Sequence, residues 1–537
     1  MMNCSIGNTL FVRAAVFSFW CFLLTPMARS QQNQDSISIA GSGEIGDTRN
    51  LLLERIQYKE GSLFRNDFVR DYSAFDVRRL SLASQPSFSD ELLYRDAAKD
   101  KVIALSTKEN AVKISFIPQL GATFYSSRNG ASYWKRSNGL AVAGSIGQNF
   151  VFYAKAIDNA LRGASPDMKK SLSEQPTYVA SIGYGGAKGY DYDDTEVQLG
   201  FRLGIVDLYL EKIRNTWGYG RGGQLVLSDR APSYPQIRAS VQILRNLKLT
   251  VLGGILNSGI IDSSQSYTDY TDGTYKTYRE VNRTKYLFAH VLEYSPINEL
   301  NIALGEEIVA SDRLTPEYLV LPAAIDHNLG ISGVHDNMNV WGGARFTCPN
   351  LGSVYTTVYV DNFGTNQNTY NFAGSIGATL VDVSRSDLDF TIEYTALRPF
   401  VYANDNKADN RTTNGFVLGD WLGENGERMQ VWLDYRPAPQ LWFTASYVTL
   451  RKGKPGVQAP AGSTAVGSVG FLDGPLFKRN EFDLRGRWEV YSGVFADISY
   501  RLITQSDQVM SRYPSFSNRP FLSFALKLNI FDRNDEW

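Results

Sequence analysis

The chain has 537 residues, with 54 Lys and Arg against 55 Asp and Glu, so its formal charge at pH 7 is −1. This balance supplies no basic surface, and we expect no nucleic-acid partner. The composition is unusual in its 46 Gly, 30 Tyr and 29 Phe. Many glycines and aromatic rings favour a β-sheet protein with tight turns and interfacial side chains over a helical enzyme.

Residues 1–30 have the pattern of a secretory signal peptide, in which Arg13 precedes the apolar run 14–24 and small residues follow up to Ser30. The apolar run is too short to span a bilayer as a helix. Cleavage near Ser30 removes two of the 3 cysteines and leaves Cys348 alone. An internal disulfide is therefore excluded from the mature chain, and its stability must come from hydrogen bonding and packing.

Residues 31–108 lack the alternation seen later in the chain. Two stretches, 48–57 and 89–105, look like short amphipathic helices, with Thr48 and Ser89 near possible N-caps. We expect a small helical segment packed as a plug at the periplasmic mouth of the domain that follows. The alternative is a disordered linker.

From residue 109 to residue 537, apolar and polar residues alternate repeatedly over about ten positions, which is long enough for a tilted membrane-crossing strand. The last such segment is the clearest: Leu522, Phe524 and Leu526 share one face, and Ser523 and Lys527 share the other. The segments 197–205, 482–490 and 494–502 repeat the split, and the chain ends on an aromatic residue, Trp537. The polar faces carry charges such as Arg202, Glu393, Asp434, Arg485, Arg487 and Arg501. These charges require a polar interior.

Connection lengths separate a barrel from a soluble β-sandwich or propeller, which also alternates. Short turns are interleaved with long loops at 259–283, 311–336, 403–426, 453–479 and 506–519. Short periplasmic turns and long extracellular loops are typical of outer-membrane barrels. The fold class predicted is all-β, a transmembrane antiparallel β-barrel. Reading 141–158 as one long bent strand makes every short turn periplasmic and gives 18 strands.

The stretch 217–236 contains G-x-G-x-x-G at Gly218, Gly220 and Gly223. This spacing binds a dinucleotide only when a helix N-terminus follows, and here prolines follow at Pro232 and Pro235. The barrel topology instead makes 216–234 an extracellular loop, in which the glycines allow tight packing.

Aromatic and arginine side chains in two loops are the candidate carbohydrate-binding residues. Rings can stack on the C–H face of a sugar, and arginine offers a forked donor to uronic-acid carboxylates. The alternative for the rings is an aromatic girdle or loop packing. The candidates are Trp217, Tyr219, Arg221, Arg230 and Tyr234 in the first loop, and Tyr267, Tyr270 and Tyr275 in the second.

Other chemistry has little support in the sequence. His290, His327 and His335 are too far apart to suggest a metal motif. The acidic stretch 190–196 lacks the glycine of a calcium loop, and we interpret it as a solvated extracellular loop. Ser228 and Asp229 have no neighbouring histidine for a hydrolase triad. We therefore expect no catalytic residue, metal or cofactor.

Four stretches of the sequence resemble the capsule assembly protein Wzi family in their order and spacing: 217–236, 288–309, 318–328 and 358–363. The resemblance implies an 18-stranded outer-membrane barrel with a helical N-terminal plug, and a lectin-like, non-catalytic role in attaching capsular polysaccharide to the cell surface. No binding residue is carried over, because no short invariant motif maps onto these positions.

From these patterns we expect an outer-membrane protein whose partners are capsular or extracellular polysaccharide, outer-membrane lipid and lipopolysaccharide, with a monomer as the expected state. The alternative function is a porin-like diffusion channel for small solutes, because charges in the lumen are also what a porin needs.

Overall fold

The computed structural model describes residues 68–69, 103–106, 112–127, 132–163, 179–184, 187–270, 276–320, 336–361 and 371–530, the last range with gaps at 385, 405, 439, 455–469, 492 and 509–515. Within these ranges, no helix is long and apolar enough to cross a membrane. The predicted signal peptide and the predicted helix at 48–57 lie outside the described residues.

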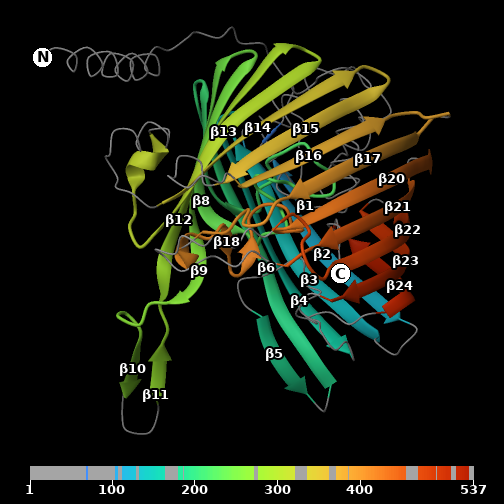
Figure 1. The fold of residues 1–537 in the computed structure, drawn as a ribbon, viewed down its shortest axis with the longest axis horizontal. Helices are drawn as coiled ribbons and strands as arrows, with labels where there is room; N and C mark the ends of the chain where they lie inside the picture. Colours follow the sequence, from blue (N-terminus) through green and yellow to red (C-terminus); the bar gives the residue numbers. More distant parts are fainter. Residues whose placement is uncertain are drawn as a thin grey trace, which may run out of the picture.

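The described part of the chain forms a closed antiparallel barrel of 18 strands (Figure 1). The barrel strands are β2 (Val112–Ser127), β3 (Ser132–Ile146), β4 (Phe150–Gly163), β6 (Ala187–Leu203), β7 (Val206–Ile213), β8 (Tyr234–Leu244), β9 (Leu247–Ile261), β12 (Asn282–Ile297), β13 (Leu300–Ser311), β14 (Asn337–Cys348), β15 (Gly352–Asp361), β16 (Asn371–Leu380), β17 (Leu388–Leu397), β20 (Gly426–Ala438), β21 (Leu441–Lys452), β22 (Phe477–Tyr491), β23 (Val494–Asp507) and β24 (Phe516–Leu528). Closure pairs β24 with β2, from Leu120↔Leu528 to Ser127↔Phe521. The barrel therefore has no free edge, and the predicted fold class is confirmed.

The remaining elements lie at strand ends or in loops. Strands β1 (Ile103–Ser106) and β5 (Val179–Tyr184) pair with parts of β2 and β6 and add no strand to the barrel wall. The hairpin of β10 (Tyr267–Tyr270) and β11 (Lys276–Arg279) projects away from the barrel (Figure 1). The loop between β17 and β20 contains η2 (Lys407–Asp409), β18 (Thr412–Thr413) and β19 (Phe416–Val417), and η1 (Pro316–Leu319) follows β13.

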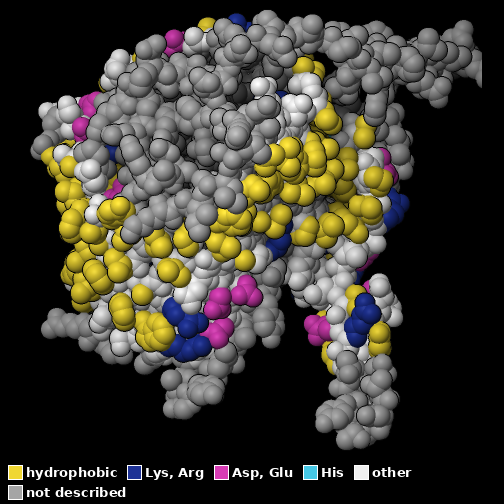
Figure 2. Space-filling view, turned by 180° about the vertical axis from the view of Figure 1, so that it is seen from behind, with side chains coloured by type: hydrophobic (Ala, Val, Ile, Leu, Met, Phe, Trp, Pro, Cys, Tyr) yellow, Lys and Arg dark blue, Asp and Glu magenta, His cyan; other side chains and the backbone are white. Residues whose placement is uncertain are grey.

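Along each barrel strand, successive side chains point alternately to the lipid and to the lumen. On β24, Leu522, Phe524 and Leu526 are each at least 50% exposed, whereas Ala525 and Lys527 are buried at 2% and 5%. Figure 2 shows such apolar side chains as a belt across one outer face of the barrel. Exposed apolar rows outside and buried charges inside are stable only when lipid covers the outer face.

Short turns and long loops lie at opposite ends of the barrel, as the connection lengths predict. Turns such as 204–205 and 245–246 join strands at one end. Long connections such as 214–233 and 398–425 join them at the other end, which is extracellular in the usual orientation of outer-membrane barrels.

Two predictions of secondary structure are wrong. The range 141–158 is two strands, β3 and β4, because Gly147 takes a φ of +59° in the turn between them. The count of 18 still holds, because the short strands β1 and β5 lie outside the barrel count. The predicted helix at 89–105 ends in residues that pair as strand β1 with β2. The rest of that predicted helix lies outside the described residues.

The acidic stretch 190–196 lies inside strand β6 and is not a solvated loop. Asp194 accepts a hydrogen bond from Lys155 Nζ at 2.9 Å, and Arg214 lies 3.2 Å from the same carboxylate. Asp191, Asp194 and Glu196 each lie within ion-pair distance of a cation on a neighbouring segment, so most of the stretch behaves as a strand with paired charges.

Candidate functional site

The loop 214–233, between β7 and β8, folds into the lumen of the barrel. Trp217, Tyr219 and Val226 are each at most 2% exposed and belong to the largest buried apolar cluster. The backbone of Trp217 bridges to Val69 on one side and Leu227 on the other. The loop starts and ends at the extracellular end of the barrel, as predicted, but its aromatic side chains lie inside the lumen and not at the surface. The apolar residues of this segment are better shielded inside the barrel than above it.

The glycine motif cradles an anion, and the anion is a carboxylate of the barrel wall. The backbone N–H groups of Arg221 and Gly222 donate to Glu393 on β17, at 2.7 and 3.2 Å. Successive N–H groups that converge on one carboxylate form an anion-binding nest. A Cβ on Gly222 would lie 2.9 Å from the same carboxylate, so glycine permits the approach.

A second loop, 398–425 between β17 and β20, meets the first one inside the barrel. Its Arg411 is fully buried and donates to Glu307 on β13, with Nη2 2.8 Å from Oε2. Arg411 also donates to the carbonyl oxygen of Val226. Its guanidinium lies 5.0 Å from the ring centres of both Tyr359 and Tyr402, which are in contact with each other. Arg411 thus fastens both loops, which we call the inward loops, to the barrel wall.

The inward loops are fastened a second time by Arg428 on β20. Its guanidinium donates to both oxygens of Asp420 at 2.9 and 3.1 Å and lies 3.3 Å from Glu393. A Cβ on Gly223 would lie only 2.2 Å from Asp420. Buried charges of this kind are tolerated because each one is paired and hydrogen-bonded.

The predicted residues of the first loop mostly have packing contacts. The Trp217 ring lies edge-on to that of Trp341, with ring centres 6.4 Å apart. The ring centres of Tyr219 and Phe68 are 5.0 Å apart, and the Tyr219 hydroxyl donates a hydrogen bond to Asn301 Oδ1. Tyr234 is 4% exposed, and its hydroxyl accepts a hydrogen bond from Asn215. Arg230 is partly exposed. These rings have no open face for a sugar, and their role is the loop packing that the sequence left as the alternative.

Arg221 has a different environment from those rings. Its guanidinium pairs with Asp434 at 2.5 and 3.1 Å and lies 4.8 Å from the ring centre of Trp432. Its side chain lines a pocket on the inner wall. The structure therefore separates Arg221 from the aromatic residues with which the sequence grouped it.

The tyrosines of the second predicted loop lie on the projecting hairpin. Tyr267 is 51% exposed and Tyr278 is 58% exposed, with Arg279 6.0 Å from the ring centre of Tyr267. Tyr270 ends strand β10, opposite Lys276. Tyr275 lies outside the described residues. The hairpin presents aromatic rings to solvent beyond the barrel.

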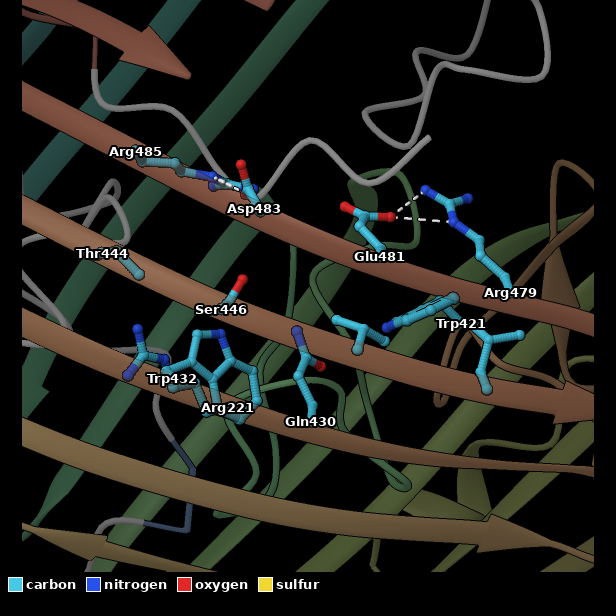
Figure 3. Close-up of a pocket in the computed structure, with 12 residues that line it drawn as sticks. Arg221, Trp421, Gln430, Trp432, Thr444, Ser446, Arg479, Glu481, Asp483 and Arg485 are labelled. Atoms are coloured by element: carbon cyan, nitrogen blue, oxygen red, sulfur yellow. Dashed lines mark hydrogen bonds and ion pairs between the residues drawn. The ribbon is translucent and has the colours of Figure 1, made fainter. Parts of the chain in front are cut away.

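The pocket on the inner wall, which we call the lumenal pocket, lies between strands β20, β21 and β22 and the inward loops (Figure 3). Its empty space is about 600 Å³, part of it open to solvent. Gln430 and Trp432 come from β20, Ser446 from β21, Arg479, Glu481, Asp483 and Arg485 from β22, and Arg221 and Trp421 from the inward loops. A cavity lined by both polar and aromatic side chains suits a polar ligand.

Sequence reasoning missed Trp421, Trp432, Arg411 and Glu307. The sequence does indicate the orientation of Trp432: it lies two residues from both Gln430 and Asp434 on one strand, so it shares their lumen-facing side. No local pattern marks Arg411, because its partner Glu307 is 104 residues away in sequence. Among the described residues, no group of three or more His, Cys, Asp and Glu side chains is arranged to hold a metal.

No protein-family model and no curated protein sequence matches the chain. Solved structures do. One is Wzi, an outer-membrane protein involved in group 1 capsule assembly in Escherichia coli and described as a carbohydrate-binding β-barrel. It aligns with a TM-score of 0.55 at 11% identity, over 90% of this chain and 98% of Wzi.

A second match is OprD from Pseudomonas aeruginosa, with a TM-score of 0.42 at 12% identity, over 77% of this chain and 93% of OprD. A third is OccAB1 from Acinetobacter baumannii, with a TM-score of 0.43 at 11% identity, over 80% of this chain and 98% of OccAB1. The match to Wzi shows the fold. The chain is an outer-membrane β-barrel. The apolar belt and the charged interior agree with that location.

Proposed function

We propose that this outer-membrane barrel binds capsular or extracellular polysaccharide and holds it at the cell surface without catalysing a reaction. The observation that carries the proposal is that two loops fold into the lumen. An 18-stranded barrel is wide enough for water unless loops occupy it, and here two loops do so.

The fastening of these loops favours a binder over a diffusion channel. Arg411 and Arg428 are each at most 1% exposed, and each pairs with buried carboxylates of the wall or of the inward loops. Removing either partner of such a pair leaves an uncompensated buried charge, which costs about 3–5 kcal/mol. Loops held this firmly keep part of the lumen occupied, which supports binding over free diffusion of solutes.

The projecting hairpin supplies a surface that a polymer can reach. The exposed rings of Tyr267 and Tyr278 can stack against sugars, and Arg279 can pair with an acidic substituent. The fold is similar to that of Wzi, whose description names carbohydrate binding, and this similarity also supports a polysaccharide ligand.

The test compares cell-bound with shed polysaccharide in cells with and without the protein. We expect the cell-bound fraction to fall on deletion and to return with the wild-type chain. A Tyr267→Ala/Tyr278→Ala double variant should restore it only in part. Tyr447→Ala is the matched control, because Tyr447 is 47% exposed on the lipid-facing side of β21. An unchanged cell-bound fraction on deletion would contradict the proposal, and large, steady currents from the purified protein in planar bilayers would favour the channel.

A further inference from the structure

Four charged side chains lie on the outer wall of the barrel, at the extracellular ends of β17, β20, β21 and β22, which are neighbours in the wall (Figure 1). Glu427 on β20 lies opposite Arg451 on β21, and Arg451 lies opposite Lys478 on β22. Arg398 directly follows β17, and its guanidinium lies 5.0 Å from the ring centre of Phe372, which is 46% exposed on β16. Alternation turns these side chains away from the lumen. We call Arg398, Glu427, Arg451 and Lys478 the rim cluster.

The rim cluster has a paired middle and an exposed cation at each end. Arg451 Nε donates to Glu427 Oε1 at 2.7 Å, and the Tyr394 hydroxyl donates to Oε2 of the same carboxylate at 2.8 Å. Arg398 and Lys478 are exposed, and neither is in an ion pair within the described part of the chain. Each of these two cations can therefore take an anion without first breaking a salt bridge.

The two end cations are far apart. Three strand intervals of about 4.8 Å separate β17 from β22, so Arg398 and Lys478 start from positions about 14 Å apart along the wall. The contact with Phe372 on β16 holds the Arg398 guanidinium on the side away from Lys478. One phosphate group therefore does not reach both cations, whereas two phosphate groups at opposite ends of a disaccharide do.

Exposed apolar side chains lie directly below the rim cluster on the same outer face. They are two to four residues closer to the periplasmic end of each strand and are 39–47% exposed: Met429 on β20, Tyr447 on β21 and Phe482 on β22. The cluster thus lies where the hydrocarbon layer meets the headgroups of the outer leaflet. A ligand that reaches it is a lipid, with its acyl chains against the apolar belt and its headgroup at the cations.

We infer that the rim cluster binds the doubly phosphorylated disaccharide headgroup of lipopolysaccharide, with one phosphate at Arg398 and the other at Lys478. Arginine and lysine are both strong phosphate binders. The paired Glu427 and Arg451 between them face the sugar rings. The inference goes beyond the proposed function and does not depend on it, because the cluster lies on the outer wall, away from the inward loops and the projecting hairpin.

The experiment is native mass spectrometry of the full-length protein in detergent micelles with three lipids: lipid A with two phosphate groups, lipid A with one, and phosphatidylglycerol. We expect the doubly phosphorylated lipid A to bind about fivefold more tightly than the singly phosphorylated form, which is the factor for one cation near an anionic surface. Phosphatidylglycerol, with one phosphate and no disaccharide, should bind more weakly than either.

Substitution of the end cations tests the two contacts. Arg398→Gln and Lys478→Gln should each weaken binding of the doubly phosphorylated lipid A by about fivefold, and the double variant by about 25-fold. The double variant should also bind the two forms of lipid A equally, since no cation is left to distinguish them. Heat-modifiable gel migration checks that each variant is folded.

Arg136→Gln is the matched control. Arg136 is an exposed arginine on β3, where it pairs with Asp158 at 3.3 Å, and three strands separate β3 from β22. Its replacement should leave binding of all three lipids unchanged. An equal loss in Arg136→Gln would show attraction by the overall charge and overturn the assignment to the rim cluster.

Three other results would also overturn the inference. They are equal binding of the two forms of lipid A by the wild type, tight binding that survives in the double variant, and phosphatidylglycerol binding as tight as that of the doubly phosphorylated lipid A. None of them bears on the proposed function, which fails only if deletion leaves polysaccharide retention unchanged.

Discussion

The buried pair of Arg411 and Glu307 gives the sharpest test of how the inward loops are held in the lumen. Both side chains are fully buried, and Arg411 also donates to the carbonyl oxygens of Leu225 and Val226 in the other inward loop. Arg411→Met keeps much of the side-chain volume but leaves the Glu307 carboxylate without its cation. Breaking a buried pair in this way costs about 3–5 kcal/mol, or roughly two to four orders of magnitude in the equilibrium between docked and undocked loops.

The barrel itself should survive this substitution, because its strands are joined by backbone ladders that Arg411 does not enter. We therefore expect Arg411→Met to retain heat-modifiable migration while protease cleaves the inward loops faster. In planar bilayers, current openings that the wild type lacks should appear.

Two further variants make the reasoning refutable. Arg411→Met combined with Glu307→Gln removes the unpaired charge and should recover most of the loop docking, since neutralising both partners of a buried pair is often nearly neutral. Arg451→Met, at an exposed pair with Glu427, should cost less than about 1 kcal/mol and open nothing. An Arg411→Met protein that is as silent and as protease-resistant as the wild type would refute this account of how the loops are held.

Three other changes probe separate parts of the molecule. Gly223→Ala should lower the free energy of unfolding by about 1–3 kcal/mol, and with it the thermal unfolding temperature, because the new Cβ would meet the buried pair of Asp420 and Arg428. Gly374→Ala is the control: its Cβ meets nothing closer than 4.0 Å, so the unfolding temperature should not change. Leu522→Arg places a charge midway along β24, at a residue that is 50% exposed on the lipid face, and should cost about 2–4 kcal/mol, seen as a lower urea midpoint in vesicles. An unchanged midpoint would mean that this face does not meet lipid. Burial raises the pKa of Asp409 above its usual 3.8, so the folded state favours the protonated acid and loses stability as the pH rises from 3.8 through the raised value. Asp409→Asn should flatten that part of the stability profile, and an unaltered profile would contradict the assignment.

The projecting hairpin and the inward loops show where prediction from sequence stopped. Both are long, glycine-containing and tyrosine-bearing connections at the same end of the barrel, and the sequence treated them alike. The structure sends Trp217 and Tyr219 into the lumen and leaves Tyr267 and Tyr278 in solvent. No local pattern distinguishes them, because the difference lies in partners such as Trp341 and Asn301 on distant strands.

Alternation determined the strands, their apolar face and their polar face, because a strand's side-chain period of two is a local property of the sequence. Connection lengths determined that the strands form a membrane barrel and which of its ends carries the long loops. Only the tertiary structure decided that two loops fold into the lumen, that the glycine motif holds Glu393, and that Arg221 faces a pocket with Trp421 and Arg485. Those features depend on charges brought together from strands far apart in the chain, and a buried charge finds its partner through space and not through sequence spacing.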